Sequence, residues 1–166
     1  MLLLGLCLVV CSFCLGQKTS KKIAVKDFEV LLGTWYGSLT YLDYTSNEAY
    51  TMPADVRVAI NAEEGYLLFS NMYPDEPHAN STDTVRISKD GKKMNQEIVK
   101  KVQSLSNGDL LLTTEYWGVD GNEQKKALIR HLYTIGNAVF IIKKEVLFES
   151  QKEWIQRHEY NYKRAK

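Results

Sequence analysis

Histidine is the side chain of this sequence best suited to move a proton or bind a metal near neutral pH. The chain has three histidines, and two of them, His131 and His158, alternate with apolar or aromatic residues in predicted strands. An inward-facing imidazole has three interpretations: a core side chain satisfied by a hydroxyl group or water, a polar group facing a ligand, or a haem or metal ligand. No two histidines have metal-ligand spacing on one element. We therefore expect neither a metal nor a cofactor, although a barrel can bring His131 and His158 together.

Tyrosine is abundant, with ten residues, and four tyrosines fall on the expected inner faces of strands. Aromatic rings with a few hydroxyl groups suit the wall of a pocket for an amphipathic molecule, and they equally suit a packed core. Arg130 and Arg157 can pair with an anionic head group if they face inward, where an unpaired guanidinium is costly. The candidate ligand-binding residues are Tyr41, Tyr116, Arg130, His131, Tyr133, Arg157, His158 and Tyr160.

Sequence patterns typical of catalysis are absent. There is no nucleophile elbow, no phosphate-cradling glycine loop and no His-Glu-x-x-His helix. Most acidic residues fall in turns or on polar faces, and Asp43, on the Trp35 face of the first strand, is the exception. We therefore predict no catalytic residue. An enzyme is an alternative that depends on His158, His131 and Asp43.

The charge of the chain is balanced, with 21 basic and 20 acidic residues and a net charge of +1. Such a balance gives no general attraction to nucleic acid or to an anionic membrane. Basic residues gather near both ends of the chain, where we expect solvated tails. They are Lys18, Lys21, Lys22, Lys163, Arg164 and Lys166.

Residues 1–16 have the features of a cleavable signal peptide. Positions 2–15 are almost entirely apolar, and this run is too short for a membrane span of about 20 residues. Cys14 and Gly16 supply small residues before a cleavage position between Gly16 and Gln17. We therefore expect a secreted or periplasmic protein without stable membrane insertion. A lipid anchor and a retained anchor are the alternatives.

The three cysteines all lie in that segment, at positions 7, 11 and 14. The mature chain can then form no disulfide and no thiolate site, so a packed core must stabilise it. A chain of about 150 residues can bury roughly 68–70% of its unfolded surface, which is enough for one core. We expect one domain over residues 17–166.

Beyond Lys22 the pattern predicts one short helix and then strands. Residues 23–32 form the helix, with Asp27 placed to cap it. Turn pairs such as Asp90-Gly91 separate the later strands, and Pro53 predicts a bend inside one strand. The expected strands are 34–43, 49–61, 66–72, 82–88, 93–102, 109–117, 124–135, 138–147 and 153–163.

The last predicted strand has two different faces. Alternation gives an aromatic face, which we expect to be the interior, and a second face that contains Arg157. The residues of the aromatic face are Trp154, Gln156, His158, Tyr160 and Tyr162.

About nine strands joined mostly by tight turns make a meander, and a meander either leaves two edges open or closes on itself. About eight strands enclose room for side chains or one small ligand. The expected fold is all-β: a single up-and-down antiparallel β-barrel of eight to ten strands with a short N-terminal helix, after the signal peptide. A two-sheet sandwich is the alternative.

The start of the first strand carries a motif, Gly33-Thr34-Trp35-Tyr36, directly after the helical turn. Gly33 lets the backbone turn sharply, and Trp35 can plug one end of a barrel. Together with Asp27-Phe28, the signal peptide and the meander, this motif resembles the lipocalins and the wider calycin superfamily. The resemblance implies a barrel with a helical plug and a central cavity for a small, mostly apolar molecule.

The chain departs from the lipocalin pattern at several points. The second signature, Thr-Asp-Tyr, has no clear counterpart, and the carboxyl-terminal disulfide is impossible. The resemblance implies a late-strand arginine over the signature Trp35, for which Arg130 and Arg157 are both candidates. The Arg-x-Tyr pair of the fatty-acid-binding branch is absent, since the last strand contains Arg157-His158-Glu159-Tyr160. The chain is therefore similar to a divergent lipocalin.

The expected function is binding of a small, largely hydrophobic or amphipathic ligand by an exported barrel, as a carrier or for sequestration. One alternative is a filled barrel that binds a protein partner through the loop at 73–81. A calycin-type enzyme is the other. Asn80-Ser81-Thr82 in this loop matches an N-glycosylation acceptor.

Overall fold

The computed structural model describes residues 19–164 of the chain. The predicted signal peptide and its cleavage position lie outside the described residues. The described elements are β1 (Thr19–Ser20), the 3-10 helix η1 (Val25–Leu31), β2 (Gly33–Leu42), β3 (Ala49–Pro53), β4 (Asp55–Asn61), β5 (Tyr66–Met72), the 3-10 helix η2 (Pro77–Ala79), β6 (Ser81–Arg86), β7 (Lys93–Met94), β8 (Glu97–Ser104), β9 (Leu110–Asp120), β10 (Lys125–Ile135), β11 (Phe140–Phe148) and β12 (Ile155–Arg164).

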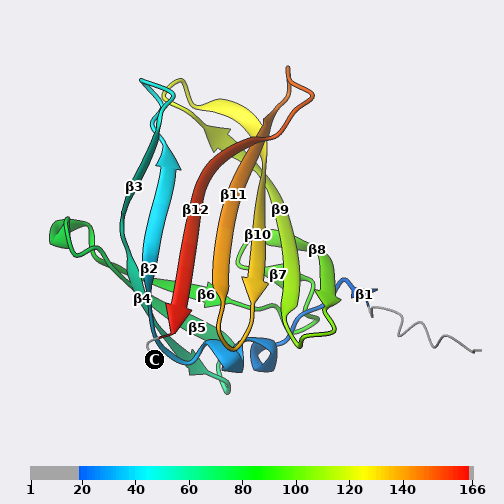
Figure 1. Ribbon diagram of the computed structural model, residues 1–166. Helices are drawn as coiled ribbons and strands as arrows, with labels where there is room; N and C mark the ends of the chain where they lie inside the picture. Colours follow the sequence, from blue (N-terminus) through cyan, green and yellow to red (C-terminus); the bar gives the residue numbers. More distant parts are fainter. Residues whose placement is uncertain (1–18, 165–166) are drawn as a thin grey trace, which may run out of the picture.

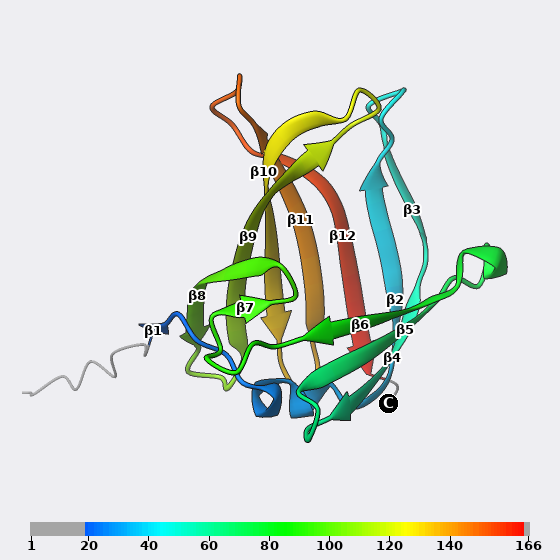
Figure 2. The ribbon, with the colours of Figure 1, turned by 180° about the vertical axis from the view of Figure 1, so that it is seen from behind.

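These strands form one antiparallel sheet that curls into a nearly closed barrel (Figure 1). The strand order is β1-β8-β9-β10-β11-β12-β2-β4-β5-β6, while β3 pairs with β2 and β7 pairs with β8. The two ends of the sheet meet through β7 and a bridge between Ile87 and Met94. Figure 2 shows β6 and β7 at this junction in the lower half of the barrel. The predicted all-β barrel is confirmed, and the sandwich is not formed.

The structure divides two of the predicted strands. The predicted strand 49–61 is split into β3 and β4 after Pro53, where the Ala54 amide donates to the carbonyl oxygen of Gly37 at 3.0 Å. The predicted strand 93–102 is split into β7 and β8, because Asn95 adopts a positive φ of 53°. The bend predicted at Pro53 is thus confirmed.

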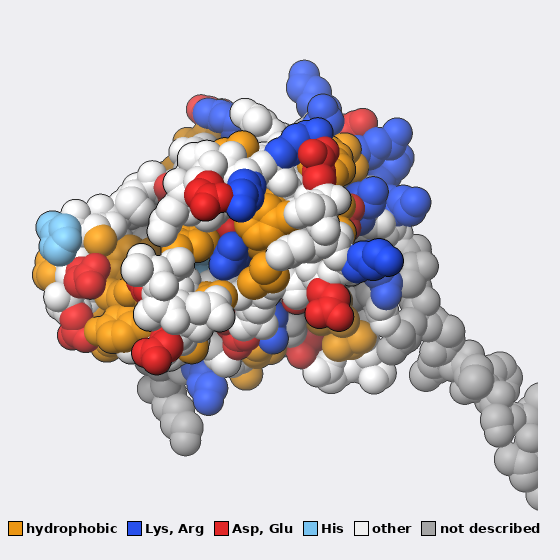
Figure 3. Space-filling view, turned by 90° about the horizontal axis from the view of Figure 1, so that it is seen from above, with side chains coloured by type: hydrophobic (Ala, Val, Ile, Leu, Met, Phe, Trp, Pro, Cys, Tyr) orange, Lys and Arg blue, Asp and Glu red, His pale blue; other side chains and the backbone are white. Residues whose placement is uncertain are grey.

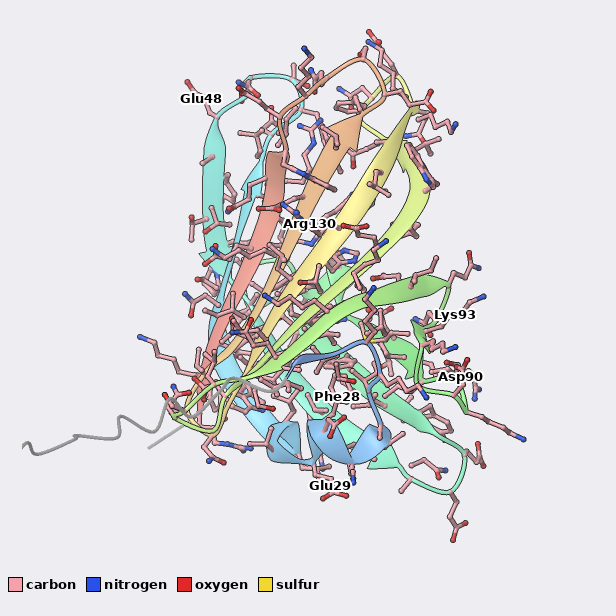
Figure 4. The ribbon with its side chains drawn as sticks, turned by 90° about the vertical axis from the view of Figure 1, so that its right-hand side faces the viewer. Phe28, Glu29, Glu48, Asp90, Lys93 and Arg130 are labelled. Carbon is pink, nitrogen blue, oxygen red and sulfur yellow. The ribbon has the colours of Figure 1, made fainter. Side chains whose placement is uncertain are left out.

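Helix η1 closes one end of the barrel. Asp27, the third residue of η1, helps to cap its start as predicted: its carboxylate accepts a hydrogen bond from the amide of the N-cap residue Ala24 at 2.8 Å. Phe28 points from η1 toward the barrel and is buried, whereas Glu29 points to solvent (Figure 4). The apolar core begins at this plug and continues upward along the inner faces of the strands.

Trp35 fills the closed end, as its motif predicts. Its side chain is 0% exposed, and its Nε1 donates to the carbonyl oxygen of Leu31 at 2.7 Å. The guanidinium of Arg164 lies 4.3 Å from the Trp35 ring and also donates to the carbonyl oxygen of Leu32 at 3.0 Å. The arginine over the tryptophan is therefore Arg164, and the expectation of Arg130 or Arg157 is wrong. Arg164 lies directly opposite Trp35 in the register of the β12–β2 pair, which the sequence alone does not show.

A β-bulge between β11 and β12 changes which side chains face inward. Lys144 pairs with His158, but Glu145 pairs with Gln156, so Arg157 is an extra residue on β12. Side-chain alternation along β12 is therefore shifted at this point. The bulge therefore determines which side chains of β12 face the interior in the upper part of the barrel.

None of the helices among residues 19–164 is long and apolar enough to cross a membrane.

Candidate functional site

A small inner cavity lies in the lower half of the barrel, above η1. Its volume is about 160 Å³, below the roughly 300–1,000 Å³ of sites for drug-sized molecules. The cavity therefore fits a small apolar group or one end of a longer molecule. Residues on its wall include Phe69, Val85, Tyr133, Phe140, Ile142 and Tyr160.

The tyrosines of this wall form a stacked series. The rings of Tyr160 and Tyr162 lie 5.7 Å apart, and Tyr162 stacks on Phe140 at 5.5 Å. The Tyr160 hydroxyl is within 2.9 Å of the Tyr73 hydroxyl. Burial, with the neighbouring Tyr73, raises the pKa of Tyr160, and burial also raises the pKa of Tyr162. These phenols stay protonated and offer hydroxyl groups at the edge of a mostly apolar wall, which also carries Asn71 and Asp83.

A layer of polar side chains, most of them ionisable, lies above the cavity, and we call it the polar layer. It contains Glu97, Thr114, Tyr116, Asp120, His131, Lys144, Arg157 and His158.

One half of the polar layer is built around Glu97 on β8. Its carboxylate lies 3.0 Å from Nδ1 of His131 and also accepts a hydrogen bond from Thr114. The ring of Tyr116 stacks on His131 at 6.2 Å. The side chains of His131 and Glu97 are only 15% and 17% exposed. This carboxylate therefore fixes the orientation of the His131 ring inside the barrel.

His158 stands between the two halves of the polar layer. Its ring lies 6.4 Å from His131 and 5.4 Å from Tyr160. Burial, with the nearby His131 and Lys144, lowers the pKa of His158 to about 4. The imidazole is therefore neutral near pH 7. The barrel does bring the two histidines together, but the residues described contain no cluster of three or more His, Cys, Asp or Glu that could hold a metal ion.

The other half of the polar layer is an ion cluster around Asp120, at the end of β9. Asp120 accepts hydrogen bonds from Nζ of Lys144 and Nε of Arg157, both at 2.7 Å, and from the Tyr44 hydroxyl at 3.1 Å. The exposed fractions of the three charged side chains are 2% for Asp120, 18% for Lys144 and 10% for Arg157. Burial acts to raise the pKa of Asp120, but the hydrogen bonds and charges of its partners prevail and lower it. One carboxylate thus serves two largely buried cations.

The bulge on β12 explains why Arg157 reaches this cluster. Strict alternation places Arg157 on the outer face and Trp154 and Gln156 on the inner face, and the structure contradicts all three placements. Gln156 is exposed, and Trp154 packs against Arg130 outside the barrel. His158 and Tyr160, on the near side of the bulge, do face inward as predicted.

Arg130 lies on the outer wall and is not part of the candidate site. Its neighbours in sequence, Ile129 and His131, face inward, so Arg130 points outward. It donates from Nε to Glu145 at 2.8 Å, and its guanidinium lies 3.9 Å from the Trp154 ring. The sequence made a role for Arg130 conditional on an inward orientation, and the structure does not meet this condition.

The remaining predicted residues divide between the site and its surroundings. Tyr116 and Tyr133 belong to the polar layer and the cavity wall. Tyr41 pairs in register with His158 and Tyr50, which places it on the inner face higher in the barrel. Whether these side chains bind a ligand stays a prediction.

Asp43 does not reach the polar layer. Its carboxylate accepts hydrogen bonds from the Ser46 and Thr45 amides at 2.7 and 3.0 Å and so closes the turn after β2. These hydrogen bonds lower the pKa of Asp43. The exception noted in the sequence is a turn residue, which removes one of the three residues on which the enzyme alternative depends.

Sequence reasoning missed Asp120, Lys144, Glu97 and Thr114. Lys144 did carry a signal, since it continues the apolar face of Phe140 and Ile142. A charged residue at such a position needs a partner inside the core. Asp120 carried no such signal, because it sits in a turn sequence where a solvated carboxylate is the usual outcome.

The fold and this site define the class of the molecule: a nearly closed, all-antiparallel β-barrel with a polar layer in its interior. One solved structure agrees with this fold. The crystal structure of Rv2717c from M. tuberculosis matches with a TM-score of 0.51 and 13% sequence identity, over 86% of this chain and 97% of that chain. At this identity the likeness extends to the fold alone. The S-type phycobiliprotein lyase CPES from Guillardia theta matches with a TM-score of 0.47 and 9% identity, over 88% and 95% of the two chains. No protein-family model matches the sequence, and no curated protein matches it.

Proposed function

We propose that the protein is a lipocalin-like barrel that binds a small amphipathic molecule after export. The observation that carries this proposal is the polarity of the barrel interior along its axis. A mostly apolar, aromatic cavity lies at the closed end and a polar layer lies directly above it. An amphipathic molecule buries its apolar part and keeps hydrogen bonds at its polar end only in an environment of this kind.

The volume of the cavity limits the ligand. About 160 Å³ is roughly five times the share of liquid volume of one water molecule. A short aliphatic chain or one ring fills it, and a large planar molecule does not. The rest of a longer ligand lies among His158, His131 and Tyr116, whose side chains face the same interior.

The test is to fill the cavity from its wall and measure binding. Val85→Phe adds a ring to a side chain that lines the cavity. Val119→Phe is the matched control, since Val119 is 51% exposed on β9. The protein is purified from its native compartment, and bound molecules are identified by native mass spectrometry and solvent extraction.

A small amphipathic molecule should be recovered from the wild-type protein and from Val119→Phe but not from Val85→Phe. Equal recovery from both variants, or a ligand without an apolar portion, would contradict the proposal. Failure to recover any molecule, combined with no binding of short-chain amphiphiles by calorimetry, would also reject it. Detection of the chain in the cytoplasm with residues 1–16 still attached would reject export alone.

One observation favours a second candidate function, binding of a protein partner. The loop between β5 and β6, with η2, extends away from the barrel (Figure 2). The Asn80 side chain orders it by accepting a hydrogen bond from the Tyr73 amide at 2.7 Å. Replacing residues 74–79 with a short Gly-Ser turn should abolish partner capture without changing ligand recovery if this function exists.

A further inference from the structure

A second pocket opens at the end of the barrel opposite η1, and we call it the mouth pocket. It lies between the β2–β3, β9–β10 and β11–β12 loops and has a volume of about 410 Å³. Figure 3 looks onto this end, where charged side chains of both signs surround the rim. The mouth pocket shares no lining residue with the inner cavity, so its occupancy is a separate question.

Arg157 forms the charged part of the mouth pocket. Its Nε is committed to Asp120, and its guanidinium lies 4.5 Å from the Tyr44 ring and 5.6 Å from the Phe148 ring. These three contacts hold the planar guanidinium in one orientation. The Arg157 side chain is only 10% exposed. Such preorganisation lowers the entropic cost of binding a ligand.

The Nη groups of Arg157 are available to a ligand. Within residues 19–164, its hydrogen bonding is limited to the Nε contact with Asp120. Since the described part of the chain also has no buried side-chain nitrogen or oxygen without a partner, the Nη groups touch the solvent of the pocket. Arginine presents paired N–H groups in a fork that matches the two oxygens of a carboxylate.

The local charge favours an anion. Arg157 and Lys144 share the single carboxylate of Asp120, so this cluster has one excess positive charge. The deeper carboxylate of Glu97 is already engaged by His131 and Thr114, and at the rim Glu123 pairs with Lys125 at 2.5 Å. The rings of Tyr44 and Phe148 beside the guanidinium give an organic group an apolar surface to lie on.

We propose that the mouth pocket binds small organic carboxylates, with the carboxylate on the Nη groups of Arg157 and the carbon skeleton against Tyr44 and Phe148. Benzoate and acetate differ in the skeleton and share the carboxylate. Inorganic phosphate shares the negative charge and lacks both the planar carboxylate and the skeleton.

Arg130 provides a matched control within the same molecule. It also pairs with a carboxylate and packs on an aromatic ring, but it lies on the outer wall, and both its Nε and an Nη group donate to Glu145. Its fork is therefore already occupied by the protein.

The test is a titration of the full chain, labelled with ¹⁵N, with sodium benzoate, acetate and phosphate at constant ionic strength. We expect benzoate to shift the Arg157 side-chain resonances in a saturable way and acetate to bind more weakly. Removal of charge-assisted hydrogen bonds in Arg157→Gln should weaken benzoate binding by about tenfold or more, and Arg130→Gln should not change it. Arg157→Lys keeps the charge and loses the fork, so it should also weaken binding.

Phosphate binding tighter than benzoate overturns the carboxylate assignment. Shifts that rise linearly without saturation, or equal binding by the Arg157→Gln and wild-type proteins, overturn the site. The wild-type titration decides the outcome even if a variant does not fold. Val85→Phe, which fills the inner cavity, should leave benzoate binding unchanged, so the proposed function and the mouth pocket can fail independently.

Discussion

Replacing Asp120 with Asn should strongly destabilise the barrel. The Asp120 carboxylate is 2% exposed and holds two cations, Lys144 and Arg157, that are 18% and 10% exposed. Asparagine has nearly the same shape, so the substitution opens no cavity. It removes the negative charge and leaves both cations inside the barrel without a counter-ion.

The expected loss follows from the burial of the pair. Removal of one partner from a buried ion pair costs about 3–5 kcal/mol, because the remaining charge stays desolvated. The exposed pair between Lys126 and Glu149, at 61% and 54% exposure, belongs to the class that contributes about 0–1 kcal/mol. Glu149→Gln is therefore the control, and a double variant Asp120→Asn with Lys144→Met should recover part of the loss by removing one cation.

The assay is urea-induced unfolding followed by tryptophan fluorescence, with the slope m compared between variants. It is repeated from pH 7 to pH 3. The pKa of Asp120 is lowered in the folded state, so its contribution is complete above the unfolded value of about 3.9 and is lost as pH falls through the lowered value. Asp120→Asn should lack this part of the acid dependence.

Two results would refute the reasoning. One is a loss below about 1 kcal/mol, equal to that of the exposed control. The other is a wild-type acid dependence between pH 4 and 3 that Asp120→Asn reproduces unchanged. Either would mean that water screens the cluster and that the barrel interior is wetter at this level than the exposed fractions indicate.

Three further predictions concern the walls, the plug and the polar layer. Gly37→Ala would place a Cβ 2.1 Å from the carbonyl oxygen of Asn161. We therefore expect the free energy of unfolding, measured with urea, to fall by about 1–3 kcal/mol. Wild-type stability of this variant would contradict the close approach of β2 and β12. Arg164→Met removes the cation over Trp35 and the hydrogen bonds to backbone carbonyl groups. Thermal unfolding should show a loss of stability of about 1–2 kcal/mol. An unchanged unfolding midpoint would contradict a stabilising role of Arg164 at the plugged end of the barrel. His158 should titrate near pH 4 by NMR. As the pH falls, the imidazole of the unfolded chain binds a proton at a higher pH than the imidazole of the folded protein, so stability should fall from about pH 6.5 toward pH 4. His158→Gln should flatten that part of the stability profile.

Much of the fold followed from local sequence features. Asp27 as a cap, Gly33 and Trp35 as a plug, and Pro53 as a bend were all predicted and are confirmed. Each depends on the residue itself and a few neighbours along the chain. The inward placement of His158 followed from alternation, for the same reason.

The candidate site was predicted less completely. Arg130 and Arg157 were both named as candidates, and the sequence did not choose between them. Asp120 was not found. The choice depends on one extra residue in β12, which reverses the alternation relative to β11. Nothing in the sequence around Arg157 marks that position as a bulge.

The sequence by itself determined that this chain folds as an antiparallel barrel with a tryptophan plug, because period-two alternation, turn residues and capping act over short distances. The tertiary structure alone decided which charges meet inside it. Asp120, Lys144 and Arg157 come from three strands, and their meeting depends on register and on the bulge. Register is set by the packing of whole strands against one another, so neither the polar layer nor the mouth pocket can be read from any one segment.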